Sequence, residues 1–226
     1  MRGMALPAFI DIEASGFGRG SYPIEVGLVD AEGGLFCSLV QPEGDWTHWD
    51  EQAAALHGIG RTLLSSHGRP AAWVAEQLNL RLQGQTVYCD GWAQDYPWLA
   101  RLFDAAERSP AFRLEDLRKL LSEEQALHWH ELVTQVRDEL SIGRHRASSD
   151  AKVLQIALAR MQAEVLNQSR WVGESFADDA RAMHYGERET EAIHGQATIE
   201  EAAQLAEEGI EVALLPFPVA PPGKTN

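Results

Sequence analysis

Short apolar runs recur through the first part of the chain, and their length is that of β-strands rather than helices. Glycine or polar residues bound each run, which is typical of strands that end in turns. Two neighbouring runs are joined by a turn that contains Gly33 and Gly34, which predicts a β-hairpin. The predicted strands are residues 8–13, 24–29, 35–40 and 86–89.

Longer segments show the spacing of an amphipathic helix, in which apolar residues return every three or four positions, as Val74, Leu78 and Leu82 do. A helix that opens at Asp95 would carry Pro97 in its first turn, where proline is tolerated. The predicted helices are residues 70–82, 95–103, 114–140 and 148–166. Strands and helices in this mixed order indicate an α/β fold.

The chain changes in character after residue 166. Residues 167–226 are rich in acids, include a capping box in which Thr198 and Glu201 begin a helix, and carry an apolar run at residues 212–215. The Pro-rich end is predicted to be unstructured. We therefore predict one domain over residues 1–166 and a C-terminal extension over residues 167–226, part of which has the residues needed to pack.

The composition fits a folded domain and limits its partners. The chain has 226 residues, of which 45% are hydrophobic, and a net charge of −15. That charge argues against a protein that spreads a basic face over a long nucleic acid. It does not argue against an enzyme that grips a few nucleotides, because bound divalent cations supply positive charge where a phosphate must lie.

Several features predict a cytoplasmic protein with no membrane partner. The apolar runs are too short for a membrane-spanning helix, and the first residues do not resemble a signal peptide. Cys37 and Cys89 both lie in strand-like apolar runs. These positions allow a structural disulfide, but reduced and buried thiols are the expected state in the cytoplasm.

Two acids stand on the first predicted strand, where the neighbouring residues are apolar. Asp11 and Glu13 are two positions apart, so both side chains leave the same face of the strand. Two carboxylates on a buried face repel each other and lose hydration unless a cation lies between them. Because oxygen ligands suit hard cations such as Mg²⁺ or Mn²⁺, the pair predicts a metal site.

Three further polar residues, and one alternative acid, are candidates for the same site. Asp95 follows the fourth strand at the predicted start of a helix, and Asp90, at the end of that strand, is the alternative acid. His145 is predicted to lie in a loop and Asp150 in the first turn of the following helix. An Asp at a helix start also serves as an N-cap or complements the helix dipole, so both interpretations stay open for Asp95 and Asp150.

Over residues 8–165 the chain resembles the DEDDh branch of the DnaQ-like 3′-to-5′ exonucleases, which have a ribonuclease-H-like fold. The first family motif, Asp-x-Glu followed by small residues and Gly, is matched at residues 11–16. The second motif centres on an Asp at a helix start, matched by Asp95, and the third is a His followed five positions later by Asp, matched by His145 and Asp150. Relatives often carry His-Asn-x-x-Phe-Asp in the second motif, whereas this chain has Asp-Gly-Trp-Ala-Gln-Asp at residues 90–95.

This resemblance implies a mixed five-stranded sheet flanked by helices, and hydrolysis of phosphodiester bonds at the 3′ end of single-stranded DNA or RNA. Two divalent ions, Mg²⁺ or Mn²⁺, would assist the reaction. The ligands of these ions would be Asp11, Glu13, Asp95 and Asp150. His145 would take the proton from the attacking water, unless it is a solvated loop residue.

The same resemblance assigns the contacts with the last nucleotide of the nucleic acid. The family has a His-Gly-Ile segment, matched here at residues 57–59, and an apolar residue after the first-motif Gly, matched by Phe17. Ala14, Phe17 and His57 would hold the terminal nucleotide, although Phe17 could instead anchor its loop in the core. Relatives are often dimers, so a homodimer is an expectation.

Two other functions are consistent with the sequence. One is a catalytically silent nucleic-acid-binding or protein-binding module on the same fold, which the acidic charge and the altered second motif favour. The other is an enzyme that acts on very short oligonucleotides or small phosphodiesters, which the scarcity of positive charge favours. The length dependence of cleavage distinguishes this enzyme from the exonuclease that the family resemblance implies.

Overall fold

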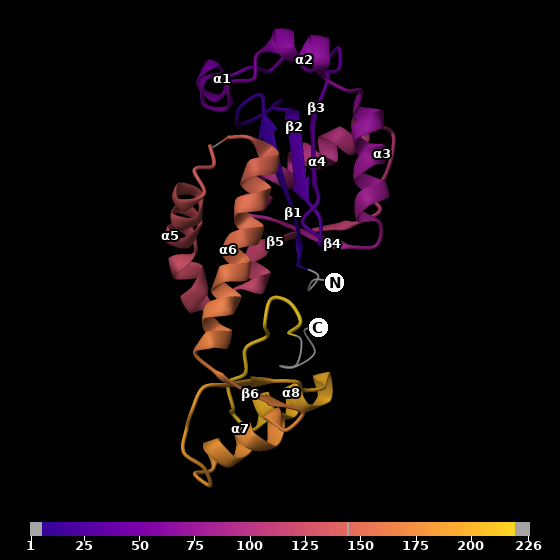
Figure 1. Cartoon of the computed structure of the whole chain (residues 1–226). Coiled ribbons are helices and arrows are strands. Elements are labelled where there is room, and N and C mark those ends of the chain that lie inside the picture. Colours follow the sequence, from indigo (N-terminus) through magenta and orange to yellow (C-terminus); the bar gives the residue numbers. More distant parts are fainter. Residues whose placement is uncertain (1–5, 144, 220–226) are drawn as a thin grey trace. The chain divides into compact units, whose positions relative to one another are not determined.

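A mixed five-stranded sheet lies at the centre of the larger part of the molecule (Figure 1). The computed structural model describes residues 6–143 and 145–219. The strands are β1 (Ala8–Ala14), β2 (Pro23–Val29), β3 (Leu35–Leu39), β4 (Thr86–Cys89) and β5 (Arg113–Asp116). They lie side by side in the order β3-β2-β1-β4-β5, with β2 antiparallel to both neighbours and β1, β4 and β5 parallel. The number of strands implied by the family resemblance is therefore confirmed.

The two faces of β1 have different roles. Alternate residues of a strand point to opposite faces of a sheet. Ala8, Ile10 and Ile12 are buried in an apolar core that they share with helices α3 (Ala71–Leu82) and α4 (Trp92–Ala105). Asp11 and Glu13 leave the opposite face and are only partly buried. One face of the strand thus builds the core, and the other presents carboxylates.

The N-terminal half of α6 (Ala147–Asn167) lies against this second face of the sheet. Gln155 of α6 donates hydrogen bonds to the carbonyl oxygens of Pro7 and Asp30, at 3.1 and 2.8 Å. The remaining helices of the larger part are α1 (Glu51–His57), α2 (Arg61–His67) and α5 (Glu123–Glu139), with a 3₁₀ turn at Leu117–Leu120.

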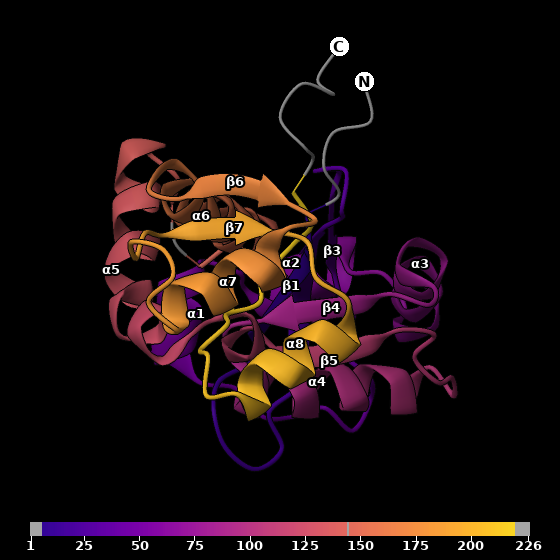
Figure 2. The ribbon, with the colours of Figure 1, turned by 90° about the horizontal axis from the view of Figure 1, so that it is seen from below.

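By its internal contacts the chain divides into two compact units within α6, at Ala157 and Leu158. In the smaller unit, β6 (Arg170–Gly173) and β7 (Ile193–Gly195) form a parallel pair, on which α7 (Phe176–His184) packs (Figure 2). The helix α8 (Ile199–Glu207) packs on α7. The domain limits expected from the sequence, 1–166 and 167–226, stay a prediction.

The predicted features of the smaller unit are partly visible in the structure. The capping box of Thr198 and Glu201 is present at the start of α8, as predicted. The apolar run at residues 212–215 takes no regular secondary structure. Gln162 of α6 exchanges two buried hydrogen bonds with the backbone of Phe217, at 2.9 and 3.1 Å. Much of the Pro-rich end, residues 220–226, lies outside the described residues.

Two predicted helices have wrong boundaries. The helix expected over residues 114–140 begins only at Glu123, because residues 113–116 form β5, whose pairing with β4 outweighs their local preference. The helix expected from Asp95 begins three residues earlier, at Trp92, and Pro97 lies inside it. The missing N–H of Pro97 is tolerated because Ala93, whose carbonyl loses its partner, is exposed to water.

The prediction that both cysteines are buried is wrong for Cys37. This residue lies on β3, which is an edge strand of the sheet, and its side chain is exposed, whereas Cys89 on the interior strand β4 is buried. Both thiols are free. None of the helices in the described ranges is both long and apolar enough to cross a bilayer.

Candidate active site

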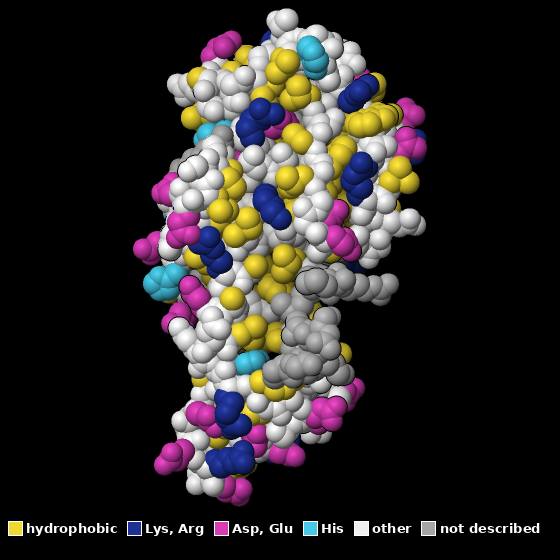
Figure 3. Space-filling view, in the orientation of Figure 1, with side chains coloured by type: hydrophobic (Ala, Val, Ile, Leu, Met, Phe, Trp, Pro, Cys, Tyr) yellow, Lys and Arg dark blue, Asp and Glu magenta, His cyan; other side chains and the backbone are white. Residues whose placement is uncertain are grey.

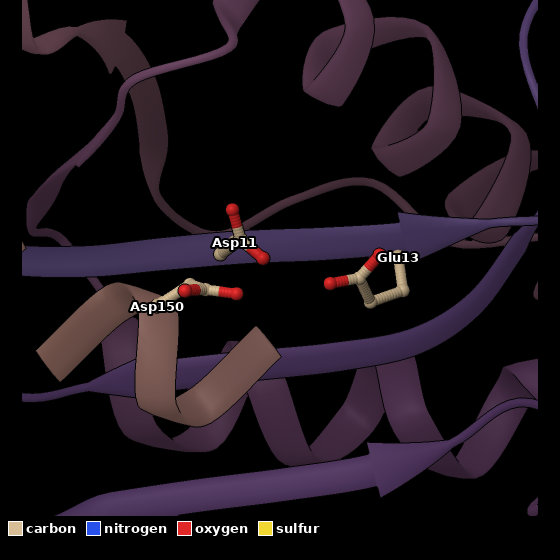
Figure 4. A group of neighbouring side chains, drawn as sticks. All are labelled: Asp11, Glu13 and Asp150. Carbon is tan, nitrogen blue, oxygen red and sulfur yellow. The ribbon is translucent and has the colours of Figure 1, made fainter. Parts of the chain in front are cut away.

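Three carboxylates converge between β1 and the first turn of α6 (Figure 4). Asp11, Glu13 and Asp150 each offer an oxygen atom, and these atoms all lie within 4.8 Å of one another. The strand spacing accounts for the first two, since residues two apart share a face. The third comes from a segment far along the chain, so the packing of α6 on the sheet decides whether the cluster forms.

Gly27 allows α6 to approach the sheet closely enough for Asp150 to lie beside Asp11. This glycine is the register partner of Asp11 on the neighbouring strand β2. A Cβ atom on it would lie only 2.0 Å from the backbone nitrogen of Ser148 and 2.2 Å from the carbonyl carbon of Ala147. The start of α6 therefore rests directly on the backbone of β2, and any side chain at position 27 would push Asp150 away from Asp11.

A buried acid fixes the same junction from the sheet side. Glu25, the register partner of Glu13, is fully buried and accepts hydrogen bonds from the Arg146 guanidinium, the shortest at 2.6 Å. It also accepts a 2.9 Å bond from the backbone N–H of Ala147, the first residue of α6. The backbone N–H of Arg146 in turn donates to Asp150 at 3.1 Å. Glu25 thus ties the segment between His145 and Asp150 to β2.

Asp95 reaches the site from α4. Asp95 is 3% exposed, and its Oδ2 atom has no hydrogen-bond partner among the described residues. The N-cap of α4 is Gly91, so the N-cap interpretation of Asp95 is wrong. The alternative acid, Asp90, is exposed. An orphaned, buried carboxylate oxygen calls for a cation or a proton, and Asp95 is the acid that meets this description.

Every candidate site residue that the sequence predicted lines one cavity of about 610 Å³. Asp11, Glu13, Asp95 and Asp150 line it together with His145, and so do Ala14, Phe17 and His57. Phe17 is 70% exposed and lies against Trp98, with ring centroids 5.9 Å apart, so it does not anchor its loop in the core. The structure brings these residues together, and their individual roles stay predictions.

Burial and mutual repulsion raise the pKa of Asp11, Glu13 and Asp95. Burial is the main cause that raises the pKa of Asp11 well above its usual value, and the charges of Asp95 and Asp150 add to it. Burial likewise raises the pKa of Glu13 and that of Asp95, each to about 7. The nearby charge of Asp150 contributes at Glu13, and a hydrogen bond from Cys89 opposes the rise at Asp95. A divalent cation would relieve this repulsion, so the donor set fits Mg²⁺ or Mn²⁺.

Three histidines line the cavity, and two of them, His57 and His145, are residues that the sequence predicted for the site. The Nδ1 atom of His57 accepts a 3.0 Å hydrogen bond from the backbone N–H of Ile59, so the neutral ring carries its proton on Nε2. That Nε2 is buried and makes no hydrogen bond to the described part of the chain, and burial lowers the pKa of the ring. His145 has a positive φ of 61°, which a residue with a side chain seldom adopts. Both features are typical of residues held for a ligand.

Sequence reasoning missed four residues that shape the site. Gly27 and the pair of Glu25 and Arg146 position α6, as described above. Arg137 of α5 lines the cavity and forms an ion pair with Asp150. Glu25 carried a signal that could have found it, since an acid in the middle of an otherwise apolar strand calls for a partner. Gly27 and Arg137 carried none.

Known structures match the larger part of this architecture. Escherichia coli exonuclease I in complex with a dA16 oligonucleotide aligns with a TM-score of 0.54 and 13% identity, over 73% of this chain and 43% of that chain. The exonuclease I of Methylocaldum szegediense aligns with a TM-score of 0.53 and 18% identity, over 78% of this chain and 45% of that one. The fold is that of the ribonuclease-H-like exonucleases. The chain spans less than half the length of these two proteins, and identities this low establish the fold alone.

The sequence matches a family model over part of its length. A family model described as a protein of unknown function (DUF1178) matches residues 113–220, just under half of the chain. The matched range includes α5, α6 and most of the smaller unit, but not β1 with its two acids. No curated protein matches the chain.

Proposed function

We propose that this chain is a metal-dependent 3′-to-5′ exonuclease of the DEDDh type. One observation carries the proposal: acids from β1, α4 and α6 meet His145 in a single cavity, although these elements are far apart in sequence. A structural role does not account for carboxylates that repel one another and have raised pKa values. Catalysis with divalent cations does account for them.

The four acids would hold two divalent cations. Asp11 is the best candidate to bridge them, because its pKa responds to the charges of all three other acids. When bound, the cations supply charge neutralisation on the phosphate and a more acidic attacking water. Asp95 contributes a buried oxygen with no other partner in the described structure, and Glu13 and Asp150 contribute oxygens from β1 and α6.

The remaining residues would move a proton and hold the substrate. His145 would accept the proton of the attacking water at the edge of the acid cluster. The Nε2–H of His57 would donate to an oxygen of the terminal nucleotide, since it is a buried donor without a partner in the described residues. The exposed ring of Phe17 would stack on the terminal base, next to the backbone of Ala14.

The structural neighbours support the class of substrate. Escherichia coli exonuclease I has been crystallised with dA16 and with a 5cy-dT13 oligonucleotide, and in a zinc-bound form with single-stranded DNA. For this chain we propose only the same class of substrate, a single-stranded nucleic acid, together with a bound divalent metal ion. The acid cluster of this chain would supply the ligands for that metal.

A second candidate, an enzyme for very short oligonucleotides or small phosphodiesters, is favoured by the charge distribution. Arg137 is the one Lys or Arg that lines the cavity within the described structure. On the face of the larger unit shown in Figure 3, Lys and Arg stand apart instead of forming a track. In the cavity and on this face, a long strand would therefore find little to bind beyond its last nucleotides.

The test uses purified chain, Mn²⁺ and 5′-labelled single strands of DNA and RNA, with a labelled dinucleotide in parallel. We expect a ladder that shortens from the 3′ end and disappears in excess chelator. Cleavage confined to the dinucleotide would establish the second candidate. If no substrate is cleaved, or if cleavage survives the chelator, the proposal fails and a silent module becomes the better interpretation.

A further inference from the structure

Arg137 places a positive charge inside an acidic cavity. It lies near the end of α5, and its side chain is only 12% exposed. One terminal nitrogen, Nη1, forms the ion pair with Asp150 and donates to the carbonyl oxygen of Gly143 at 3.2 Å. Its Nε and Nη2 make no hydrogen bond within residues 6–143 and 145–219, so further donors remain for a ligand in the cavity.

The ion pair and the predicted metal site share one carboxylate. Asp150 uses one oxygen for Arg137 and the other for the backbone N–H of Arg146. A guanidinium and a divalent cation beside the same carboxylate repel each other and compete for its charge. A phosphate that enters the cavity offers Arg137 an alternative partner, because a guanidinium matches phosphate oxygens in two-point hydrogen bonds.

We propose that Arg137 is a substrate-binding residue, and that its guanidinium exchanges Asp150 for the phosphate at the 3′ end when a divalent cation binds. This inference rests on the proposed function. It predicts two effects of opposite sign for one substitution. Removing the guanidinium should strengthen cation binding, because a competitor is lost, and should weaken the cleavage reaction, because the phosphate loses its only arginine among the described cavity residues.

The bond to Gly143 gives the exchange a structural consequence. Gly143 lies two residues before His145, in the loop that precedes α6. While Arg137 holds both Asp150 and this loop, it keeps the two halves of the His-to-Asp motif close to α5. If Arg137 served only as a structural clamp, its removal would therefore weaken cation binding at the site. Competition predicts the opposite result.

The experiment compares Arg137→Gln and Arg137→Lys with the unchanged chain. Titration calorimetry with Mn²⁺ alone measures cation binding, and KM and kcat are measured on a 5′-labelled oligonucleotide at saturating Mn²⁺. For Arg137→Gln we expect Mn²⁺ to bind several-fold more tightly and kcat/KM to fall by roughly 10- to 100-fold, the size of a lost charged hydrogen bond. Arg137→Lys keeps the charge and should lie between the two.

Arg170→Gln is the matched control, because it also removes an arginine from a carboxylate pair but does not line the cavity. It should leave both measurements unchanged, and circular dichroism should show that all variants are folded. Weaker Mn²⁺ binding by Arg137→Gln, or an unchanged kcat/KM, overturns this inference while the proposed function stands. Failure of the unchanged chain to cleave any oligonucleotide overturns the proposed function and this inference with it.

Discussion

Burial, and after it the charges of Asp95 and Asp150, raise the pKa of Asp11 well above its usual value. We expect Asp11→Asn to abolish turnover, because it removes one of the proposed metal ligands. Without divalent cation the variant should unfold at the same temperature as the unchanged chain or a few °C higher, because repulsion is relieved. The measurements are the labelled-strand assay and thermal unfolding in chelator.

The control for this substitution is Glu32→Gln. Asp30 and Glu32 have the same Asp-x-Glu spacing but lie in the turn between β2 and β3, where Glu32 is exposed. This variant should keep full activity and stability. Retention of activity by Asp11→Asn would remove Asp11 from the site.

His145 is held in an unusual backbone conformation beside the acid cluster. We expect His145→Ala to reduce kcat by roughly 10²- to 10⁴-fold, the usual contribution of a general base. Mn²⁺ affinity should change little, because His145 is not among the proposed ligands. His128→Ala, on the exposed surface of α5, is the control. A reduction of less than threefold would mean that another group takes the proton.

The raised pKa values of Glu13 and Asp95 predict that the stability of the fold depends on pH and on bound metal. Glu13 and Asp95 have pKa values of about 7 in the folded chain, against about 4 to 4.5 when unfolded. A group whose pKa is raised by folding stabilises the fold below its unfolded pKa, and this contribution is lost as the pH rises through the folded value. In chelator, the unfolding temperature should therefore fall between pH 5 and pH 8, by roughly 2–4 °C for each kcal/mol.

Excess Mn²⁺ should reduce this fall, because it favours the ionised carboxylates. The double variant Glu13→Gln, Asp95→Asn should flatten the profile in chelator, while a profile as steep as that of the unchanged chain would show that other groups cause the dependence. Thermal unfolding followed by circular dichroism measures all of these profiles.

At the scale of elements, the sequence was most informative where the signal is local. The first four strands were predicted to within two residues, because apolar runs bounded by turns need no knowledge of distant partners. The fifth, Arg113–Asp116, is four residues long and leads directly into helical segments, so only its pairing with β4 makes it a strand. The start of α4 was misplaced because Pro97 suggested a first turn that in fact lies three residues earlier.

The candidate site follows the same division. Asp11 and Glu13 were readable from one strand, and the His145 to Asp150 spacing from one junction. The bond from Arg146 to Glu25 joins residues 121 positions apart, and no local pattern announces it. Side chains that position a site across the fold are thus the part that sequence reasoning leaves to the structure.

A substitution of Gly27 tests whether the site depends on the close packing of α6 against β2. Gly27→Ala would place a Cβ atom within 2.0 Å of the α6 backbone, so the helix start must move off β2. We expect a loss of stability of about 1–3 kcal/mol, as for other overpacked interiors. We also expect much weaker Mn²⁺ binding and at least a 100-fold lower rate, because a displacement of about 1 Å at a reacting centre has an effect of that order.

The matched control is Gly44→Ala, at a glycine that has open space around its Cβ position. It should leave denaturant unfolding, Mn²⁺ titration and turnover unchanged. Full activity of Gly27→Ala would show that Asp150 does not need the observed approach of α6 to the sheet.

For the molecule as a whole, the net charge of −15 limits how strongly the proposed substrate, a nucleic acid, would be bound. A protein that contacts Z phosphates through cations loses affinity with salt, with a slope of about −0.7Z for single strands on logarithmic axes. Among the described residues, Arg137 is the one Lys or Arg lining the cavity. We therefore expect the slope of log(1/KM) against log[KCl] to be only about −1 at fixed free Mn²⁺.

Substrate length should show the same limit, since the Lys and Arg residues on the face shown in Figure 3 stand apart and form no row that nucleotides beyond the cavity would contact. The expected result is that kcat/KM rises by less than about tenfold from a trinucleotide to an oligonucleotide of about 20 nucleotides, because few further phosphates are neutralised. Arg137→Gln should bring the salt slope close to zero, whereas Arg170→Gln should not change it. A slope steeper than about −3 would require an extended basic surface, and the mode of binding would then resemble that of a processive enzyme on long strands.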